Sequence, residues 1–433
     1  MRTVRGMRDL MGNEMLVRNY IVDQATQVFK RFGYEPLDSP VMELWETLSA
    51  KGGEEVESET FKFEDKGGRE VGLRFDLTVP LARIVASNPH LPKPFKRYAI
   101  GKAWRYDRPQ AGRYREFMQA DVDIIGASSP VADAEVVLVA LEFARRTLKD
   151  NYLIKINNRK VLRGLVEIAG VKENLSYECF RSIDKFDKIG RDGVTDELSS
   201  RGISAKSSEI LLDALNIRGP GAKTLDEFEN ILKDSDIGIN GVNELKVMAE
   251  VFQEASVENQ VEFDMALARG LDYYTGPVFE GRYLGKPEVG SILGGGRYDH
   301  LIEKFGGPPT PATGVALGID RLVDIVIANK GLIDLSTGID VFLAPLNEKL
   351  VPKAAGLASM LVKEGFTVEM ELLGRPLAKL LSISDEKGAR FTVIVGPKDI
   401  QKKEVSVRDM KTKETSAVKI DGLLKFLKSS KKK

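Results

Sequence analysis

Polar and apolar side chains alternate along residues 115–125, which read REFMQADVDII. In a β-strand, every second side chain points to the same face of the sheet. The segment RFDLT alternates in the same way, with Arg74, Asp76 and Thr78 on one face. We therefore predict two strands of an antiparallel sheet, each with an apolar face turned to a core. The polar face of the longer strand carries Arg115, Phe117, Gln119, Asp121 and Asp123.

A sheet with one face in water would explain these polar faces, and for a single strand it is the commoner arrangement. The neighbouring loop favours a binding site, because Arg105, Arg108, Arg113 and Arg115 lie within one hairpin. The guanidinium group is a rigid fork of donors that matches phosphate oxygens. We expect this hairpin to bind a triphosphate or the acceptor end of a nucleic acid, with Phe117 stacking on a base.

Three glycine-containing segments later in the chain add candidate site residues. ALARGLDYYTG holds Arg269 and the pair Tyr273 and Tyr274, whose hydroxyls suit a neutral imidazole or amide ligand. GGGRYD allows close approach of a ligand to the backbone, but it has the spacing of neither a P-loop nor a dinucleotide fingerprint. GVALGIDRL places Arg321 at the start of an expected helix, which is a favourable position for binding phosphate.

Periodicity along the chain predicts an α+β protein. An amphipathic helix is expected over 14–32, followed by extended segments, a hairpin that turns at Lys66–Gly67–Gly68, and paired strands on either side of DRPQAGRY. Residues 166–254 read as short helices without a chemical motif, and strands alternate with helices after residue 337. We therefore predict a central antiparallel sheet with flanking helices, a helical insertion and a C-terminal α/β domain. The expected divisions are 1–165, 166–254, 255–330 and 337–428.

Composition excludes several classes of site. Cys179 is the single cysteine, so the chain can form no internal disulfide and no cysteine metal cluster. His90 and His300 are the only histidines, and neither has a partner at metal-ligand spacing, which argues against a histidine metal site or a catalytic triad. No apolar run is long enough for a membrane span and no secretory signal is visible, so we expect a cytoplasmic protein without membrane contact.

The formal net charge is zero, but it is unevenly distributed. Residues 337–433 contain 19 lysines and arginines against 12 aspartates and glutamates, a net charge of +7. This asymmetry is compatible with contact to a polyanion, although charge alone favours a solvated surface with a lysine tail.

Taken together, these segments resemble the class II aminoacyl-tRNA synthetases, and most closely the histidine–tRNA ligases of the archaeal and eukaryotic kind. FKRYAIGKAWRYDRPQAGRYREFMQADVDIIG looks like motif 2, ATGVALGIDRL looks like motif 3, and YEPLDSPVMEL lies where the dimer-forming motif 1 belongs. ARGLDYYTGPVFE and SILGGGRYD look like the two signatures of the histidine enzymes. The resemblance covers nearly the whole chain and is weakest over 166–254.

The resemblance implies a role for each matching residue. On the amino-acid side, Asp76, Thr78 and Gln119 match the positions that hold the α-ammonium group of L-histidine, while Asp123 and Tyr274, with Tyr273 beside it, match the imidazole pocket. On the ATP side, Arg105 matches the α-phosphate contact, Arg113 an outer-phosphate contact, Glu116 and Phe117 the adenine contacts, and Arg321 the γ-phosphate contact. Arg269 matches the catalytic arginine of the histidine enzymes. Asp76 and Asp123 depart from bacterial relatives, which carry glutamate there, so the charge is kept but moved.

The implied reaction joins L-histidine to ATP, releases pyrophosphate, and passes histidine to the 3' end of its tRNA, with Mg²⁺ bridging phosphates. The C-terminal domain would bind the anticodon, and motif 1 implies a homodimer. Alternatives are a synthetase for proline, threonine or glycine, the non-charging regulatory subunit of ATP phosphoribosyltransferase, and an RNA-binding protein with a decayed site. Arg269, Arg321 and a full C-terminal domain favour the charging enzyme.

Overall fold

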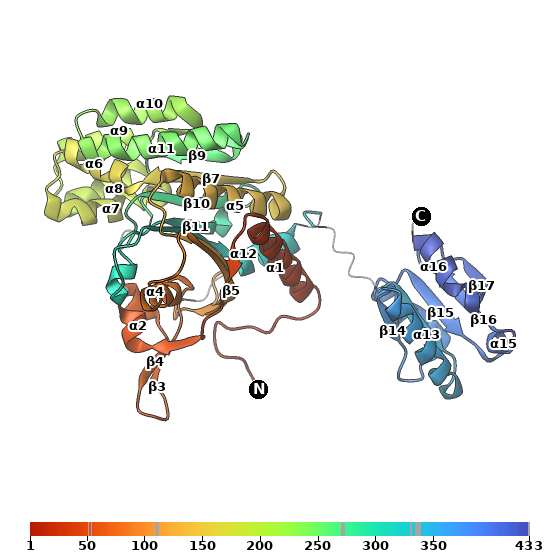
Figure 1. The fold of residues 1–433 in the computed structure, drawn as a ribbon. Coiled ribbons are helices and arrows are strands. Elements are labelled where there is room, and N and C mark those ends of the chain that lie inside the picture. The colour runs from red at the N-terminus through yellow and green to blue at the C-terminus, as the bar shows by residue number, and fades with distance from the viewer. Residues whose placement is uncertain are drawn as a thin grey trace. The chain divides into compact units, whose positions relative to one another are not determined.

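The computed structural model describes residues 1–433 except 51, 53, 109–111, 270–272, 330, 334–338, 432 and 433. The tip of DRPQAGRY, the middle of RGLDYY, most of the expected linker and the first residues of the expected C-terminal domain therefore lie outside the described residues. The chain forms two compact units, Met1–Ile333 and Asp334–Lys433, which are treated separately (Figure 1).

A nine-stranded sheet forms the centre of the first unit, in the order β1-β5-β6-β12-β11-β10-β7-β9-β8. The pairs β1–β5 and β7–β9 are parallel and the other pairs are antiparallel. This confirms the predicted sheet and the pairing of the strands around DRPQAGRY. The strands are β1 (Glu35–Pro36), β5 (Phe95–Trp104), β6 (Glu116–Ile125), β7 (Tyr152–Asn158), β8 (Arg218–Gly219), β9 (Val261–Asp264), β10 (Pro277–Tyr283), β11 (Ser291–Arg297) and β12 (Ala312–Gly318).

Helices α1 (Asn13–Arg31), α5 (Pro130–Leu148) and α12 (Ile319–Ala328) pack together and against β6 and β12. They cover the apolar face of β6, where Ala120, Val122 and Ile124 are buried. α1 matches the predicted amphipathic helix, and it ends before Gly33, whose φ of 77° suits glycine. The polar face of β6 therefore lies on the opposite side of the sheet from these helices.

A second, three-stranded sheet carries the predicted hairpin, in the order β2-β4-β3. The prediction that RFDLT is a strand is wrong, because β4 ends at Leu73 and helix α4 begins at Thr78. Asp76 explains the difference, since its Oδ1 accepts the backbone N–H groups of Thr78 (3.1 Å) and Val79 (2.9 Å) and so caps the helix. The elements here are β2 (Met42–Leu44), α2 (Trp45–Ser49), α3 (Glu54–Glu59), β3 (Lys62–Glu64), β4 (Glu70–Leu73) and α4 (Thr78–Ser87).

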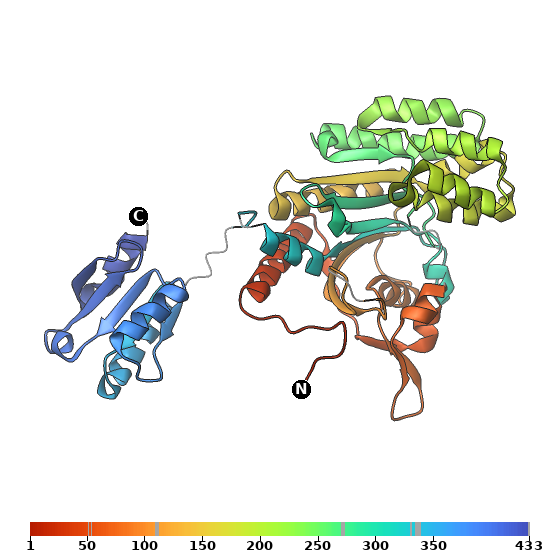
Figure 2. The same cartoon turned by 180° about the vertical axis from the view of Figure 1, so that it is seen from behind.

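Short helices follow β7, as predicted, and they stack on one side of the large sheet (Figure 2). The first of them begins at Arg159, ahead of the predicted start, and packs against the last. A methyl group on Gly164 would lie 2.6 Å from Cα of Gly238, so the two helices approach closely at glycine. The helices are α6 (Arg159–Ile168), η1 (Glu173–Leu175), α7 (Ser176–Ile183), α8 (Phe186–Ser200), α9 (Ala205–Ala214), α10 (Gly221–Leu232) and α11 (Asp236–Glu254). Short 3₁₀ turns later in this unit are η2 (Glu258–Gln260), η3 (Pro287–Val289) and η4 (Ile302–Phe305).

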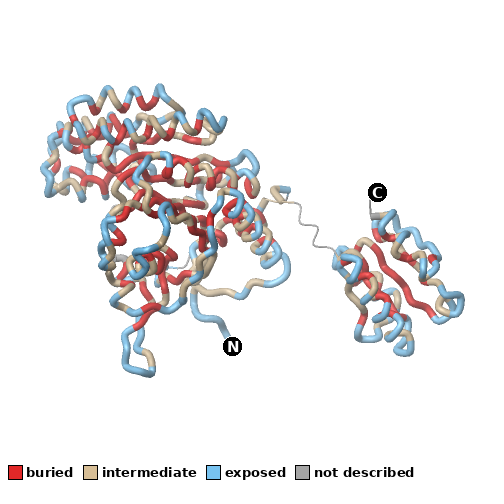
Figure 3. Tube along the Cα trace, viewed as in Figure 1, coloured by how far each residue is buried: buried red, intermediate tan, exposed pale blue. Residues whose placement is uncertain are grey.

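The second unit is a five-stranded sheet in the order β14-β13-β15-β16-β17. β13 pairs in parallel with β14 and β15, and β16 and β17 form an antiparallel hairpin. The α/β prediction is confirmed, and β13 and β15 are buried along their length (Figure 3). A short helix, α15, was not predicted. The elements are β13 (Val341–Pro345), η5 (Glu348–Leu350), α13 (Val351–Lys363), β14 (Val368–Met370), α14 (Leu377–Glu386), β15 (Phe391–Val395), α15 (Pro397–Gln401), β16 (Glu404–Asp409), β17 (Thr415–Lys419), η6 (Ile420–Gly422) and α16 (Leu423–Lys431).

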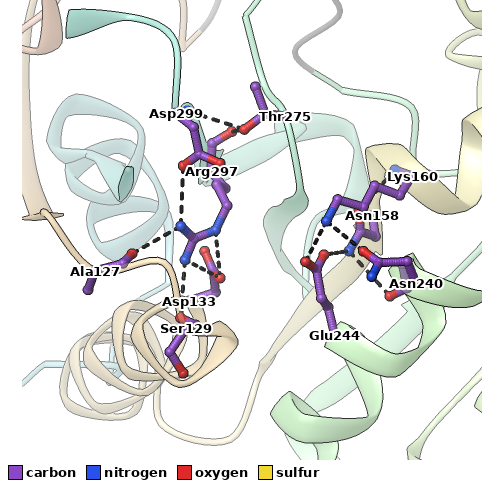
Figure 4. A network of polar contacts seen from close by, with 11 residues as sticks. Ala127, Ser129, Asp133, Asn158, Lys160, Asn240, Glu244, Thr275, Arg297 and Asp299 are labelled. Atoms are coloured by element: carbon purple, nitrogen blue, oxygen red, sulfur yellow. Dashed lines mark hydrogen bonds and ion pairs between the residues drawn. The ribbon is translucent and has the colours of Figure 1, made fainter. Parts of the chain in front are cut away.

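Arg297, the arginine of GGGRYD, ties the end of β11 to the start of α5 (Figure 4). Its Nε and Nη2 atoms donate to Oδ2 of Asp133 at 3.0 and 2.7 Å. Its other donors reach the carbonyl oxygens of Ala127 and Ser129 and the carboxylate of Asp299. Arg297 and Asp133 are both buried, and burial raises the pKa of Asp133 to about 6 while the Arg297 charge opposes the rise. Arg297 is therefore a structural residue that fixes where β11 ends.

Arg297→Met is expected to lower the free energy of unfolding by about 3–5 kcal/mol, because it leaves a buried carboxylate without its cation. Urea denaturation followed by tryptophan fluorescence measures this in the first unit, which contains both tryptophans, Trp45 and Trp104. The matched control is Arg145→Met at an exposed pair with Glu142, where the expected change is below about 1 kcal/mol. Equal effects of the two substitutions would contradict the anchoring role.

Candidate active site

Small residues form a floor across the sheet on the face opposite α5 and α12. In the paired strands, Asp121 of β6 lies beside Ala99 of β5 and Ala316 of β12, and Ala316 lies beside Gly294 of β11. The next strand places Glu280 beside Gly294. This row therefore holds a carboxylate on β6 and a carboxylate on β10, separated only by alanine and glycine.

The polar face of β6 is not in water over its second half. Asp121 is 2% exposed and Asp123 is 3% exposed. The alternative of a solvated sheet face is therefore excluded for these two residues. Gln119 and Phe117, nearer the start of the strand, are partly exposed. The strand thus runs from an accessible end at Phe117 to a closed end at Asp123, over about 20 Å at the usual rise per residue.

Asp123 is the centre of the closed end. The guanidinium of Arg97, which is fully buried, lies with Nη2 2.7 Å from Oδ2 of Asp123 and donates to the carbonyl oxygen of Leu77 at 3.0 Å. The hydroxyl of Tyr298 donates to Oδ1 of Asp123. Burial raises the pKa of Asp123, and Arg97 and Tyr298 act in the opposite direction.

Besides Arg97, Tyr298 is a site residue that sequence reasoning missed. It follows Arg297 within GGGRYD, so the motif was noticed but its tyrosine was given no role. Burial and the Asp123 charge raise the pKa of Tyr298, so its hydroxyl stays protonated and can donate. A signal was available, because a tyrosine next to a glycine-rich strand offers a hydroxyl where the backbone is open to a ligand.

Tyr273 and Tyr274 are both partly buried and both lie near Asp123. Their hydroxyls are 3.0 Å apart and their ring centroids 4.3 Å apart, and the ring of Tyr273 lies 6.1 Å from that of Tyr298. A methyl group on Gly296 would lie 3.0 Å from Cδ1 of Tyr274, so this ring rests on the glycine floor.

Asp76 and Thr78 are held together at the start of α4. The cap formed by Asp76 fixes Thr78 at the first position of the helix. The Asp76 charge contributes to raising the pKa values of Asp121, Asp123 and Tyr273, which places the carboxylate among them.

Arginines gather at the accessible end of the floor. Nε of Arg105 donates to the carbonyl oxygen of Phe75 at 3.1 Å, and its Cζ lies 5.3 Å from the ring centroid of Phe117. Nη1 of Arg269 donates to Oε1 of Glu280 at 2.5 Å and to Oγ of Ser291 at 2.8 Å. A methyl group on Gly294 would lie 2.8 Å from Cζ of Arg269, so this guanidinium also lies flat on the floor.

Arg321 completes the cluster from the start of α12, as its sequence position predicted. It donates to the carbonyl oxygens of Gly112 (3.1 Å) and Ser291. Its neighbour Asp320 fixes the helix, accepting from Arg18 of α1 and from the backbone of Met118 in β6, both at 2.6 Å. Burial lowers the pKa of Arg321, and the charges of Arg113, Arg269 and Arg105 lower it further. Four arginines thus converge where their mutual repulsion favours a bound anion.

Glu116 lies apart from the other predicted adenine contact. Its carboxylate accepts from Nζ of Lys102 (2.7 Å) and Nε1 of Trp104 (3.0 Å), and it projects from the face of β6 opposite Phe117. Arg113 is half exposed and pairs with Asp107 at 3.1 Å, on the edge of the cluster. Arg115 has a structural role, because its guanidinium stacks on Tyr106 at 3.8 Å.

The two histidines and the single cysteine have no part in this site. His90 and His300 are exposed, and Nδ1 of His300 lies 3.1 Å from Glu303. Cys179 is buried, which raises the pKa of its thiol to about 12 and keeps it protonated. Within the described part of the chain, no group of three His, Cys, Asp or Glu side chains could hold a metal ion. None of the described helices is both long enough and apolar enough to cross a membrane.

Asp121→Asn is expected to stabilise the ligand-free protein at neutral pH by about 1–3 kcal/mol, because neither oxygen of the buried Asp121 has a hydrogen-bond partner among the described residues. Burial raises the pKa of Asp121 well above its usual value; the positive charges of Arg97 and Arg105 oppose the rise, and the negative charges of Asp123 and Asp76 add to it. The folded state therefore holds this proton more tightly than the unfolded state. The cost of the ionised form appears as the pH rises above the unfolded pKa, so the gain from asparagine should vanish near pH 4.

Thermal unfolding of the parent and Asp121→Asn between pH 4 and 8 checks this expectation. Asp123→Asn is the contrasting substitution, since it leaves Arg97 buried and unpaired and should destabilise by about 3–5 kcal/mol. A loss of stability in Asp121→Asn at pH 8 would show that the Asp121 charge has a partner.

Known proteins resemble this chain along both of its compact units. The family model described as histidyl-tRNA synthetase matches residues 6–322, and the model described as anticodon binding domain matches residues 340–430. The chain is 38% identical to the histidine–tRNA ligase of Pyrococcus furiosus over 99% of this chain and 98% of that protein.

Two solved structures are similar as well. The histidyl-tRNA synthetase of Nostoc sp. has a TM-score of 0.87 at 29% identity and covers 99% of both chains. An ATP phosphoribosyltransferase regulatory subunit/histidyl-tRNA synthetase from Bacillus halodurans has a TM-score of 0.77 at 25% identity, over 91% of this chain and 98% of that one. Because the first family model matches residues 6–322 and the archaeal relative is 38% identical over 99% of this chain, the chain belongs to the histidine–tRNA ligase family.

Proposed function

We propose that this chain activates L-histidine with ATP, forming histidyl-adenylate and pyrophosphate, and then transfers histidine to the 3' end of its tRNA. The observation that carries the proposal is the polarity of one sheet face. Buried carboxylates and tyrosine hydroxyls lie at its closed end, and four arginines converge at its accessible end. A small cationic or hydrogen-bonding ligand suits the first end, and a polyphosphate suits the second.

The closed end would recognise the amino acid. Asp123 and Tyr274, with Tyr273 beside them, bind the imidazole, and Tyr298 fixes the orientation of the Asp123 carboxylate. Asp76, Thr78 and Gln119 bind the α-ammonium group at the start of α4 and on β6. A pocket that hydrogen-bonds a polar side chain leaves its own buried groups unpaired when an apolar analogue enters, which supports selection by roughly 10⁴-fold.

The accessible end would bind ATP. Arg105 and Arg269 contact the α-phosphate, while Arg321 and Arg113 contact the outer phosphates. Phe117, with Arg105 behind its ring, stacks on adenine. The side chain of Glu116 is engaged with Lys102 and Trp104, so its contribution to the adenine site comes through the main chain.

The proposed reaction requires little proton transfer by protein side chains. A carboxylate oxygen of histidine attacks the α-phosphorus of ATP, a P–O bond forms, and the bond to pyrophosphate breaks. Arg105 and Arg269 stabilise the negative charge that develops on the α-phosphate oxygens. A ribose hydroxyl at the 3' end of tRNA then attacks the carbonyl carbon of the adenylate and releases AMP.

Mg²⁺ is proposed to accompany ATP in this reaction. The described residues hold no three-ligand protein cage, and magnesium bound largely through phosphate oxygens and water matches the chemistry of such nucleotide sites. When bound, the ion neutralises charge on the polyphosphate. The protein residues above bind and orient ATP around it.

The four-part division of the chain is kept as a proposal. Residues 1–165 and 255–330 form the catalytic domain, 166–254 the helical insertion, and 337–428 the anticodon-binding domain. The family match over 340–430 and the second compact unit support the last of these. We also propose that the protein acts in the cytoplasm, where tRNA is charged.

A homodimer is proposed through motif 1. Val41, Met42 and Leu44 on and beside the edge strand β2 are exposed apolar residues, as is Phe63 on β3. An exposed apolar edge strand is a surface that a twofold partner can cover. Sedimentation velocity that finds only a monomer at micromolar concentration would reject this assembly.

The non-charging regulatory subunit is not better supported than the charging enzyme. Both family models match, and the near-full-length relatives are named as histidine–tRNA ligases. Arg269 and Arg321 lie in one cluster with Arg105.

Histidine-dependent exchange of labelled pyrophosphate into ATP tests the activation step across all twenty amino acids, with and without Mg²⁺. Arg269→Ala is expected to lower the exchange rate with histidine by about 10²–10³-fold, because a donor to the developing charge is lost. Arg282→Ala is the control, since Arg282 shares the Glu280 carboxylate without being assigned to the phosphate. Near-parent exchange in Arg269→Ala, or exchange with another amino acid, would overturn the assignment.

A chain that ends at Ile333 is expected to keep histidine-dependent exchange but to lose at least tenfold in the rate of tRNA charging. The first unit contains every residue assigned to histidine and ATP, whereas the second contains the match to the anticodon-binding model. Aminoacylation with labelled histidine at fixed tRNA concentration measures the loss. Unchanged charging would show that the second unit does not contribute to tRNA binding.

A further inference from the structure

Three acceptor atoms without donors lie next to each other on β6. They are both carboxylate oxygens of Asp121 and Oε1 of Gln119, each buried and without a hydrogen-bond partner among the described residues. Oδ2 of Asp123, further along the same face, also lacks a hydrogen bond, but it lies 2.7 Å from Nη2 of Arg97 in an ion pair. Because side chains two positions apart share a strand face, these atoms point to the same side of the sheet. Buried acceptors are almost always satisfied in folded proteins, so this group marks the place of a missing donor.

The neighbours of Asp121 in the sheet are small. Its lateral neighbours in the sheet are Ala99 and Ala316, which have no atoms beyond Cβ to fill the space or to donate a hydrogen bond. A ligand that approached the carboxylate from the floor side would meet no larger side chain from the two neighbouring strands in this row.

None of the nearby cations donates a hydrogen bond to Asp121, although Nε and Nη1 of the buried Arg97 have no hydrogen-bond partner among the described residues. Arg97 pairs with Asp123 and donates to the carbonyl oxygen of Leu77, and Arg105 donates to the carbonyl oxygen of Phe75. Arg74 donates to Lys102 and Ser39. These guanidinium groups act on Asp121 through their charge at longer range, without a hydrogen bond to it.

The chemistry of the missing group follows from the acceptors. Three acceptor atoms, one pair of them on a carboxylate, match a group that carries several donors, no acceptor and a positive charge. An alkylammonium has three N–H donors and fits this description, whereas a phosphate or carboxylate would be repelled.

We infer that Asp121 binds the α-ammonium group of the amino-acid substrate, together with Gln119. The inference rests on the proposed function and adds a residue to its amino-acid site. Asp76 is less available for this role than the resemblance implies, because its Oδ1 already accepts two backbone N–H groups of α4. β6 places Asp121 about 7 Å along the strand from Asp123, so one ligand can present its ammonium to the first and its imidazole to the second.

The test compares two ligands that cannot react, since neither has a carboxylate. L-Histidinol keeps both the ammonium and the imidazole of histidine, and 3-(imidazol-4-yl)propan-1-ol lacks the ammonium. Isothermal titration of the full-length protein is expected to show that Asp121→Asn weakens histidinol binding by about 10–100-fold, the range of a lost charge-assisted hydrogen bond. Binding of the deamino ligand should change less than about threefold, well below the effect of one such bond.

Two matched variants make the outcome specific. Tyr274→Phe removes a hydroxyl assigned to the imidazole, so it should weaken both ligands by the same factor. Asp213→Asn, an exposed residue of α9, should leave both unchanged. If Asp121→Asn does not fold, Asp121→Ser replaces the carboxylate with a smaller uncharged group and is expected to show the same loss of selectivity.

The outcomes separate this inference from the proposed function. Unchanged histidinol binding by Asp121→Asn, or equal weakening of both ligands, overturns the role of Asp121 while histidine-dependent exchange by the parent still supports the function. A parent protein that binds neither ligand and exchanges pyrophosphate with no amino acid overturns the proposed function and this inference with it.

Discussion

Small residues at a few positions on one face of the central sheet are the constraint on which the active site depends. Gly294 lies under the guanidinium of Arg269 and Gly296 under the ring of Tyr274, while Ala99 and Ala316 flank Asp121. A larger side chain at any of these positions would lift the functional groups away from the sheet or exclude the ligand. The glycines of SILGGGRYD are thus explained by close approach between side chains and backbone, and the sheet supplies a rigid base for groups that must be fixed within fractions of an ångström.

The buried pair of Arg97 and Asp123 orients the Asp123 carboxylate at the closed end, and this orientation has a cost in stability. Taking both charges out of water is expensive, and a salt bridge of this kind seldom stabilises more than a well-packed apolar pair would. Its benefit is geometric, because Arg97 and Tyr298 together hold both oxygens of Asp123 in place. A carboxylate fixed in this way can distinguish an imidazole from a side chain of similar size by the position of its N–H group.

Local sequence patterns predicted most helices and strands, and they predicted where the polar residues of β6 and Arg321 lie. The alternation of REFMQADVDII was enough to place Phe117, Gln119, Asp121 and Asp123 on one face, and the arginine of GVALGIDRL was expected at a helix start. The prediction of a strand at RFDLT was wrong because the Asp76 carboxylate caps α4 instead. A strand and a capped helix start can show the same short alternation of polar and apolar residues. The contact between Tyr298 and Asp123 could not be predicted, because it joins residues 175 positions apart and depends on the register of several strands. The separation of Glu116 from Phe117 followed from strand parity and could have been read from the sequence.

The two ends of the site carry opposite electrostatic burdens in the ligand-free protein. At one end, acceptor atoms are buried without donors, and at the other, arginines converge until the pKa of Arg321 falls. Each arrangement lowers stability on its own, and under the proposed function each would be relieved by a different part of the reactants, an ammonium group at the first and a polyphosphate at the second. Binding free energy is therefore concentrated on the two charged groups that flank the reacting atoms, the carboxylate of the amino acid and the α-phosphorus of ATP. Under the proposed function the reacting atoms would lie between these two ends, and holding them in position is the main contribution that a protein can make to a reaction needing so little proton transfer.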